Sequence, residues 1–355
     1  MENIAHTLVG YSLSKAGLQK VTPYATAALM IGANLPDVEV AGSLFGANYL
    51  DSHRGVSHSA AGILLLSFGL AGAFWIVSRI RRTGARERLK LFPLWYVSFL
   101  GLLSHPLLDF LNDYGLRPWL PFSSRRYYGD LLSIVDPWLW LIFGAAAFLM
   151  TASRRGRIRW AVLGSILTLL VAVLVPPAQG LLWILSVPAA LWIGRFLRSR
   201  GFNPASAAWL AFFVYIGGLA GARGIVVNAA RASGPALVAD QIREIDVLPG
   251  RPASIGHWFA VMEAADKYYV ADVYLQNWSS RPPQFVAFDK NLENRYYRES
   301  LAQEGMAAMS RFARFPFVRI EEGPAGSHTV LLGDLRYIRN RTGGWGTARA
   351  TVPSR

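Results

Sequence analysis

Apolar runs long enough to cross a bilayer constrain this chain more than any other feature. Runs of about 18 or more apolar residues are typical of membrane-spanning helices, because the hydrocarbon core of a bilayer is about 30 Å thick. Such runs lie near residues 60–78, 91–111, 132–152, 158–176, 180–197 and 207–228. A weaker run over 23–46 is interrupted by Asn34, Pro36, Asp37 and Glu39. With 53% hydrophobic and only 16% charged residues, the chain is predicted to be an integral membrane protein.

The last third of the chain has a different pattern. Residues 254–264 and 267–275 indicate two strands joined in a hairpin, and 328–338 indicate another strand. Residues 294–315 fit one amphipathic helix, and 232–240 fit a junction between domains. We therefore predict an all-α polytopic membrane domain over 1–228, with six to seven helices that span or re-enter the bilayer. A small α+β extracytoplasmic domain over 229–355 is expected to follow it.

The orientation follows from the placement of basic residues. The segments 79–90, 154–159 and 195–200 are rich in Lys and Arg, whereas 176–180 carries no charge. By the positive-inside rule the first three are cytoplasmic and the last is external. The spans then alternate across the membrane. This places His53 and His58, which precede the span at 60, on the external side. His105 and Asp109, at the end of the span 91–111, and the C-terminal domain lie on the same side.

The net charge of +14 also raises the question of nucleic-acid binding. Residues 1–228 carry 20 Lys and Arg against 9 Asp and Glu, while 229–355 carry 16 against 13. The excess therefore belongs to the short loops of the membrane half, where topology explains it, and no nucleic acid is expected as a partner. The chain has no cysteine, so it has no disulfide framework and no thiolate site.

Histidines and carboxylates are concentrated at the predicted external face. His105 and Asp109 are spaced i, i+4, so they share a helix face and can supply two ligands to one cation. His53 and His58 do not share a face, and could converge only if His53 lies on a loop and His58 opens the following helix, for which Ser57 is the N-cap candidate. Imidazole and carboxylate suit zinc, manganese or iron. A structural network of hydrogen-bonded polar residues is the alternative.

The loop 112–137 is the second concentration of polar residues. Arg125 and Arg126 could hold a phosphate or an anionic headgroup. Asn112, close to the helix face of His105 and Asp109, is a further candidate for substrate binding. Asp130 and Asp136 could act as the catalytic base, ligate a metal or pair with those arginines. The aromatic residues of this loop also fit an interfacial belt.

Five motifs, taken in order, resemble a known family. The segments "AHTLVG", "GANLPDVE", "HRGVSHS", "SHPLLDFLNDYG" and "PFSSRRYYGD…IVDP" are similar to those of the membrane-bound metal-dependent hydrolases, also described as LexA-binding, inner-membrane-associated hydrolases. The resemblance covers about residues 1–140 clearly, and a looser one links the pattern to zinc-dependent phospholipase C. It implies a helical integral protein of the bacterial inner or plasma membrane with a metal centre, for which zinc is the expected ion. Glu39 stands where the family pattern leads one to expect Asp. The ligands that the resemblance implies are His6, Asp37, His53, His58, His105 and Asp109.

The function expected from the sequence is a metal-dependent membrane hydrolase at the external face. Its substrate would be a small molecule or a lipid, with a phosphoester bond as one candidate, and membrane lipid would surround it. The alternative is a non-catalytic docking or regulatory protein whose polar cluster is structural or metal-stabilised. In either case the C-terminal domain offers a place for a protein partner.

Overall fold

Alternation of long apolar helices with short polar connections organises the first two thirds of the chain. The computed structural model describes residues 1–46, 48–80, 89–233, 242–276, 282–323, 326–337 and 345–353, without the side chains of 43–45. It divides into two compact units. The first comprises Met1–Glu39, Arg54–Gly221 and Arg251–Ile255; the second comprises Val40–His53, Ala222–Gly250 and Gly256–Arg355. The predicted domain boundary at 228/229 stays a prediction.

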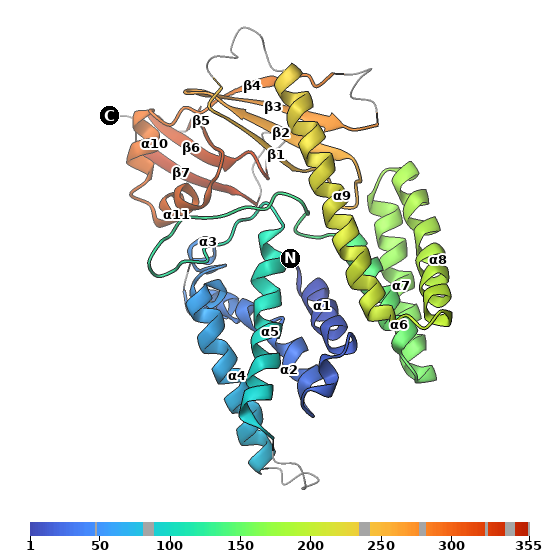
Figure 1. Ribbon diagram of the computed structural model, residues 1–355. Helices are drawn as coiled ribbons and strands as arrows, with labels where there is room; N and C mark the ends of the chain where they lie inside the picture. The colour runs from blue at the N-terminus through green and yellow to red at the C-terminus, as the bar shows by residue number, and fades with distance from the viewer. Residues whose placement is uncertain are drawn as a thin grey trace. The chain divides into compact units, whose positions relative to one another are not determined.

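Among the described residues, five helices are long and apolar enough to cross a membrane. They are α4 (Ala60–Ile80), α5 (Leu91–Phe110), α7 (Arg154–Leu174), α8 (Pro177–Ser199) and α9 (Pro204–Ser233) (Figure 1). The predicted span over 132–152 is α6 (Pro137–Met150), which at 14 residues is shorter than the bilayer core requires. Its start is fixed by Asp136, which caps the helix, and by Pro137 at the first helical position.

The weak run 23–46 does not form a single helix. It divides into α2 (Ala25–Gly32) and a 3₁₀ segment, η2 (Leu35–Phe45). Pro36 accounts for the break, because it disfavours helical backbone at the preceding residue. The two helices of the N-terminal hairpin, α1 (Asn3–Lys15) and α2, are joined through the short 3₁₀ turn η1 (Leu18–Lys20).

Glycines let α2 approach α5 closely. A Cβ added at Gly101 would lie 2.8 Å from the carbonyl oxygen of Leu29, and one at Gly32 would lie 3.0 Å from the amide nitrogen of Leu102. Helix α5 packs on α4 as well, and the two lie side by side in Figure 1. This packing brings the C-terminal end of α5 next to the residues that follow α2.

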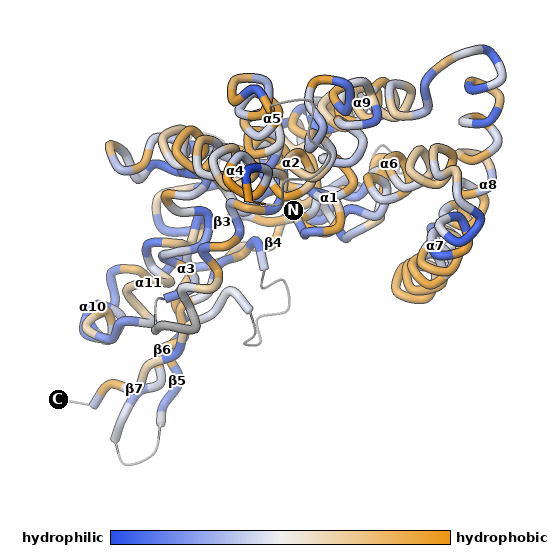
Figure 2. Tube along the Cα trace, turned by 90° about the horizontal axis from the view of Figure 1, so that it is seen from below, coloured by the Kyte–Doolittle hydropathy of each residue, from blue (hydrophilic) through white to orange (hydrophobic). Residues whose placement is uncertain are grey.

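Helices α7 and α8 expose most of their apolar surface. Only Val171 of α7 is buried, while Val173 and Leu174 are each 73% exposed. Figure 2 shows the hydrophobic colour along most of α7. Apolar surface of this extent is stable next to lipid and unstable next to water, as expected for membrane helices.

Two small antiparallel sheets and short helices build the second unit. One sheet has the order β1-β2-β3-β4 and the other β5-β6-β7. Strands β2 (His257–Glu263) and β3 (Lys267–Tyr274) form the predicted hairpin, with Phe259 opposite Asp272 and Val261 opposite Val270. The third predicted strand is β6 (Ser327–Asp334). The remaining strands are β1 (Glu244–Pro249), β4 (Val286–Asp289), β5 (Pro316–Glu322) and β7 (Thr347–Pro353).

The single helix predicted over 294–315 is wrong. The structure has two helices there, α10 (Arg295–Ser300) and α11 (Glu304–Phe312), with extended backbone at Gln303 between them. Both pack on strands β6 and β7 of the same sheet. The short helix α3 (Tyr49–Ser52) belongs to this unit and contacts α11. Most of the predicted junction 232–240 and of the basic segment 79–90 lies outside the described residues.

Candidate metal centre

The last two turns of α5 carry the pair that the i, i+4 spacing predicted. His105 is fully buried and Asp109 is 1% exposed. The two side chains share one face, and His105 Nε2 lies 3.5 Å from Asp109 Oδ2. Because burying a carboxylate away from water is costly, Asp109 needs cationic partners around it.

His6 reaches this pair from α1. Its ring stacks on that of His105, with centroids 3.7 Å apart and an interplanar angle of 12°. Its Nε2 lies 3.5 Å from Asp109 Oδ1. Neither ring nitrogen of the buried His6 makes a hydrogen bond to a described residue. Burial lowers the pKa of His6 to about 3, so the ring is neutral and keeps a lone pair free for a cation.

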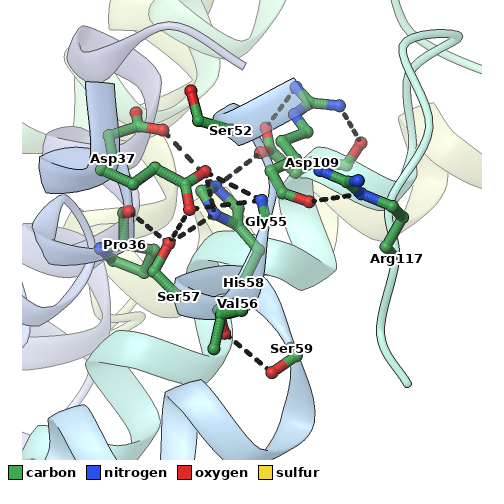
Figure 3. Close-up of polar contacts among 12 residues, drawn as sticks. Pro36, Asp37, Ser52, Gly55, Val56, Ser57, His58, Ser59, Asp109 and Arg117 are labelled. Carbon is green, nitrogen blue, oxygen red and sulfur yellow. Dashed lines mark hydrogen bonds and ion pairs between the residues drawn. The ribbon is translucent and has the colours of Figure 1, made fainter. Parts of the chain in front are cut away.

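The segment after α2 and the turn before α4 supply the other members. His58 ends η3 (Val56–His58), and its Nε2 lies 3.0 Å from His105 Nε2 and 3.5 Å from Asp109 Oδ2. Asp37, from η2, places Oδ1 at 3.4 Å from both histidine Nε2 atoms. Figure 3 shows how the side chains of Asp37, His58 and Asp109 lie around this centre.

Hydrogen bonds on the far side of each ring determine which nitrogen faces the centre. His105 Nδ1 lies 2.7 Å from the carbonyl oxygen of Ala33, an acceptor, so Nδ1 carries the proton. His58 Nδ1 lies 3.0 Å from Glu39 Oε1. With a proton on Nδ1, the neutral form of either ring directs its Nε2 lone pair at the centre, which is the arrangement that metal-ligating histidines show. Glu39, noted in the sequence only as a departure from the family pattern, therefore orients His58.

The loop between these elements is held by serines. Ser57 donates to the carbonyl oxygen of Pro36 at 2.8 Å and contacts Glu39, so it ties η3 to η2. The sequence-based expectation that Ser57 caps α4 is wrong, because Ser59 accepts from the amide of Gly62 instead. A Cβ on Gly62 would lie 1.9 Å from the carbonyl oxygen of Val56, so this close turn requires glycine.

Three carboxylates surround His58. Burial opposes ionisation of His58, but hydrogen bonds to Asp109, Asp37 and Glu39 outweigh it and raise the pKa of His58 to about 10. Burial raises the pKa of Asp37, yet its bonds to His105 and His58 hold that pKa well below the usual range. Without a cation His58 is therefore protonated on both nitrogens, and a divalent cation bound at Nε2 would take the place of that proton.

Arg54 is the member of the site that sequence reasoning missed. It is 2% exposed, and its Nη2 donates to Asp109 Oδ1 at 2.8 Å. Nη1 donates to Asn112 Oδ1 at 2.9 Å, and the guanidinium lies 4.6 Å from the centroid of the Tyr114 ring. The amino group of Met1 also contacts Asp109. The signal in the sequence was an arginine between two histidines, but no local pattern names its partner.

The donor atoms fit a metal ion. His6, His105 and Asp109 form one group whose ligand atoms lie within 4.8 Å of one another, and Asp37, His58 and His105 form a second. Nitrogen and oxygen ligands about 2.0–2.1 Å from a tetrahedral zinc ion lie about 3.3 Å apart. The separations of 3.0 and 3.4 Å within the second group are close to that value.

His53 is not in either group. It belongs to the second unit, where it ends α3 and stacks on Tyr49 with ring centroids 4.9 Å apart. The backbone turns between His53, which is extended, and Arg54, which has a φ of 53°. The five-residue spacing therefore sends His53 and His58 to different surroundings.

The loop 112–137 returns to the end of α5. The amides of Leu131 and Leu132 both donate to the carbonyl oxygen of Leu111 at 2.9 Å, and a Cβ on Gly129 would lie 2.4 Å from the carbonyl oxygen of Phe110. Asp130, 2% exposed with a φ of 55°, is thus held beside the helix end that carries Asp109. Neither Asp130 nor Asp136 belongs to the two groups.

The other predicted residues of this loop have diverse surroundings. The carboxylate of Asp136 accepts from the amides of Trp138 and Leu139, so it caps the start of α6. It also accepts from the hydroxyl of Tyr215. Asn112 is fully buried, and its Oδ1 accepts from Arg54 and from the Tyr114 amide. Half-buried Arg126 lies over the Tyr114 ring at 6.0 Å, whereas Arg125 is exposed beside Tyr127.

Apolar helices around a buried His/Asp centre define the class: a polytopic membrane protein with residues that could hold a metal ion. The YdjM inner membrane protein family matches residues 1–179, which is half of the chain. The chain belongs to this family, and the match confirms the resemblance inferred from the motifs. It is therefore an inner membrane protein.

One curated relative is the uncharacterized protein YfhP of Bacillus subtilis (strain 168). It is 26% identical over 120 residues, a stretch that covers 34% of each chain. The chain thus spans about a third of the length of this relative. No solved structure matches the chain.

Proposed function

We propose that this protein is a metal-dependent hydrolase of the inner membrane, with zinc held by Asp37, His58, His105 and Asp109 and completed by His6. One observation carries the proposal: two histidine Nε2 atoms and two carboxylates converge, and both Nδ1 atoms are engaged elsewhere. The two Nε2 atoms lie 3.0 Å apart, and both face the carboxylates of Asp37 and Asp109, so one cation between them would satisfy all four groups.

The chemistry divides among a few side chains. When bound, the metal lowers the pKa of a coordinated water and polarises the bond to be cut. Asp130 accepts a proton from the attacking water, since it is held beside the end of α5. Arg126 binds an anionic group of the substrate from its position over Tyr114, the ring that Arg54 also contacts. A phosphoester, including that of a lipid headgroup, is the substrate class that suits this charge pattern.

The distribution of basic residues supports an external site. The segments 154–159 and 195–200 mark the cytoplasmic side, and the residues before α4 and after α5 fall opposite to it. The proposed enzyme therefore acts at the external face of the membrane, as the sequence led us to expect.

Elemental analysis of the detergent-purified protein tests the centre directly. Wild type is expected to carry one or two equivalents of zinc, because the donor set offers two overlapping groups. The His58→Ala/His105→Ala variant is expected to carry none, since His105 is common to both groups. His257→Ala is the matched control: this histidine is buried too, but its Nε2 bonds Asp272 in the second unit.

The alternative, a docking or regulatory protein, gives a different result. If wild type binds no metal even after incubation with zinc or manganese, the polar cluster is structural and the hydrolase proposal is wrong. If metal is bound and chelation lowers only the melting temperature, the centre stabilises the fold without catalysis.

The Glu39→Gln variant tests whether Glu39 helps His58 to bind the metal by orienting its ring. Glu39 contacts His58 Nδ1 and takes no place in the two groups, so the variant keeps the ligands but loses the charged acceptor behind one of them. Zinc affinity is expected to fall about 10–100-fold, as measured by competition with a chelating dye. Unchanged affinity would show that His58 does not bind zinc through Nε2.

A further inference from the structure

An apolar groove lies between helices of the first unit, and none of the candidate metal ligands lines it. It has a volume of about 500 Å³ and is lined from α1, α6, α7 and α8. Its walls include Leu8, Trp140, Phe148, Gly164 and Trp183. Filling such an apolar groove with water is unfavourable in free energy, so the groove suits a hydrocarbon chain.

A second hollow adjoins the groove and has the opposite character. Its volume is about 420 Å³, and Arg157, Arg195 and Arg198 line it together with Leu149, Ser199 and Phe148. Phe148 lines both spaces, so they adjoin at this side chain near the end of α6. Arg157 lies near the start of α7, while Arg195 and Arg198 lie near the end of α8, at the level where a bilayer has its headgroups.

Among the residues that the structure describes, no acidic side chain pairs with these arginines. The sequence has no Asp or Glu between Asp136 and Asp240, although nine arginines fall in that stretch. Within the described part of the chain, none of the three arginines forms an ion pair. Arg198 donates to the carbonyl oxygen of Leu149, and this hydrogen bond fixes its position. The guanidinium groups of Arg157 and Arg195 line the hollow and can bind a ligand. Guanidinium groups bind phosphate in a bidentate geometry, so the hollow is complementary to a phosphate.

We propose that this pair of spaces binds one anionic phospholipid. Arg157 and Arg195 hold the phosphate of its headgroup, and one acyl chain lies in the groove. The site is distinct from the metal centre: it adjoins Phe148 near the end of α6, whereas the loop beside the metal centre leads into the start of α6 at Asp136. Bound lipid would join α7 and α8 to the rest of the first unit.

The headgroup part is tested with two matched charge variants. Arg157→Gln/Arg195→Gln removes two arginines from the hollow, and Arg154→Gln/Arg155→Gln removes two exposed arginines of the same helix that do not line it. Native mass spectrometry of protein titrated with phosphatidylglycerol or phosphatidylcholine gives the affinities. The first variant is expected to bind phosphatidylglycerol about 30-fold more weakly, since each basic residue near anionic lipid contributes about fivefold.

The acyl part is tested by filling the groove. A Cβ added at Gly164 meets no neighbouring atom within 4 Å, so Gly164→Leu occupies the groove without a clash. It is expected to weaken both lipids alike. Gly69→Leu on α4, which is equally open and lies outside the groove, is the control. Gly144→Leu, on the facing helix α6, repeats the test if the first variant is unstable.

Three results would overturn the proposal. In the first, both arginine variants lose the same affinity for phosphatidylglycerol. In the second, wild type binds phosphatidylglycerol and phosphatidylcholine equally well. In the third, both groove-filling variants bind lipid as wild type does. The first would assign the arginines to general membrane charge. The second would leave an apolar groove without headgroup selection.

Discussion

The Asp109→Asn variant is expected to unfold about 3–5 kcal/mol more easily than wild type and to lose its metal. Asp109 is buried and faces Arg54 at 2.8 Å, so its neutralisation leaves a guanidinium without a counter-ion inside the first unit. The same carboxylate faces His58 and His105, so the change also removes a proposed ligand. Tryptophan fluorescence during titration of detergent-purified protein with dodecyl sulfate measures the unfolding.

Two further variants separate the causes. Asp51→Asn makes the same substitution in a solvent-exposed ion pair with Arg311, and its effect is expected to stay within about 1 kcal/mol. Adding Arg54→Met to Asp109→Asn removes the unpaired charge, so stability is expected to recover while the metal stays lost. If Asp109→Asn were as stable as Asp51→Asn, the pair would not contribute to the fold.

Local spacing predicted the parts of the centre that lie within one element. His105 and Asp109 share a face of α5 because their separation matches the helical repeat, and the structure brings them together. The hairpin of β2 and β3 followed from alternating strands around a short turn. In both cases the information needed lies within about 20 residues of sequence.

Contacts between distant segments could not be predicted in the same way. Arg54 meets Asp109 across 55 positions, and Glu39 meets His58 across 19. From the sequence, His53 and His58 were equally good candidates for metal ligands. The backbone turn at Arg54 directs them to different surroundings. Which histidine enters the centre depends on how η2 packs against η3, a tertiary property. The motif resemblance supplied the candidate ligands, and the packing of the segments determines which of them reach the centre.

Helix boundaries show the same limit of local patterns. The apolar run 132–152 begins as loop because Asp136 caps α6 and the preceding residues return to the end of α5. Residues 294–315 keep an amphipathic pattern throughout, yet the chain breaks at Gln303 so that α10 and α11 can each pack on the sheet. Periodicity indicates which face is buried, and the surface available for burial decides how far the helix continues.

The largest effects on catalysis are expected from His105 and Asp130, in different ways. With bis(4-nitrophenyl) phosphate as the probe, His105→Ala is expected to lose about a thousandfold or more in turnover, because a bound metal contributes several kcal/mol to transition-state stabilisation. Asp130→Asn is expected to lose about 10²–10⁴-fold, the usual contribution of a general base, while it keeps its zinc. Asparagine tolerates the positive φ of this position, so the backbone is preserved.

The combination of metal content and turnover distinguishes the roles. A residue that binds the metal loses both together, whereas a base loses turnover alone. Asp136 provides the comparison within the same loop: its carboxylate already accepts from two amides and from Tyr215, so Asp136→Asn should leave turnover near that of wild type. If Asp136→Asn instead reproduced the loss expected for Asp130→Asn, the base would lie at the start of α6, and the attacking water would have to approach from that side.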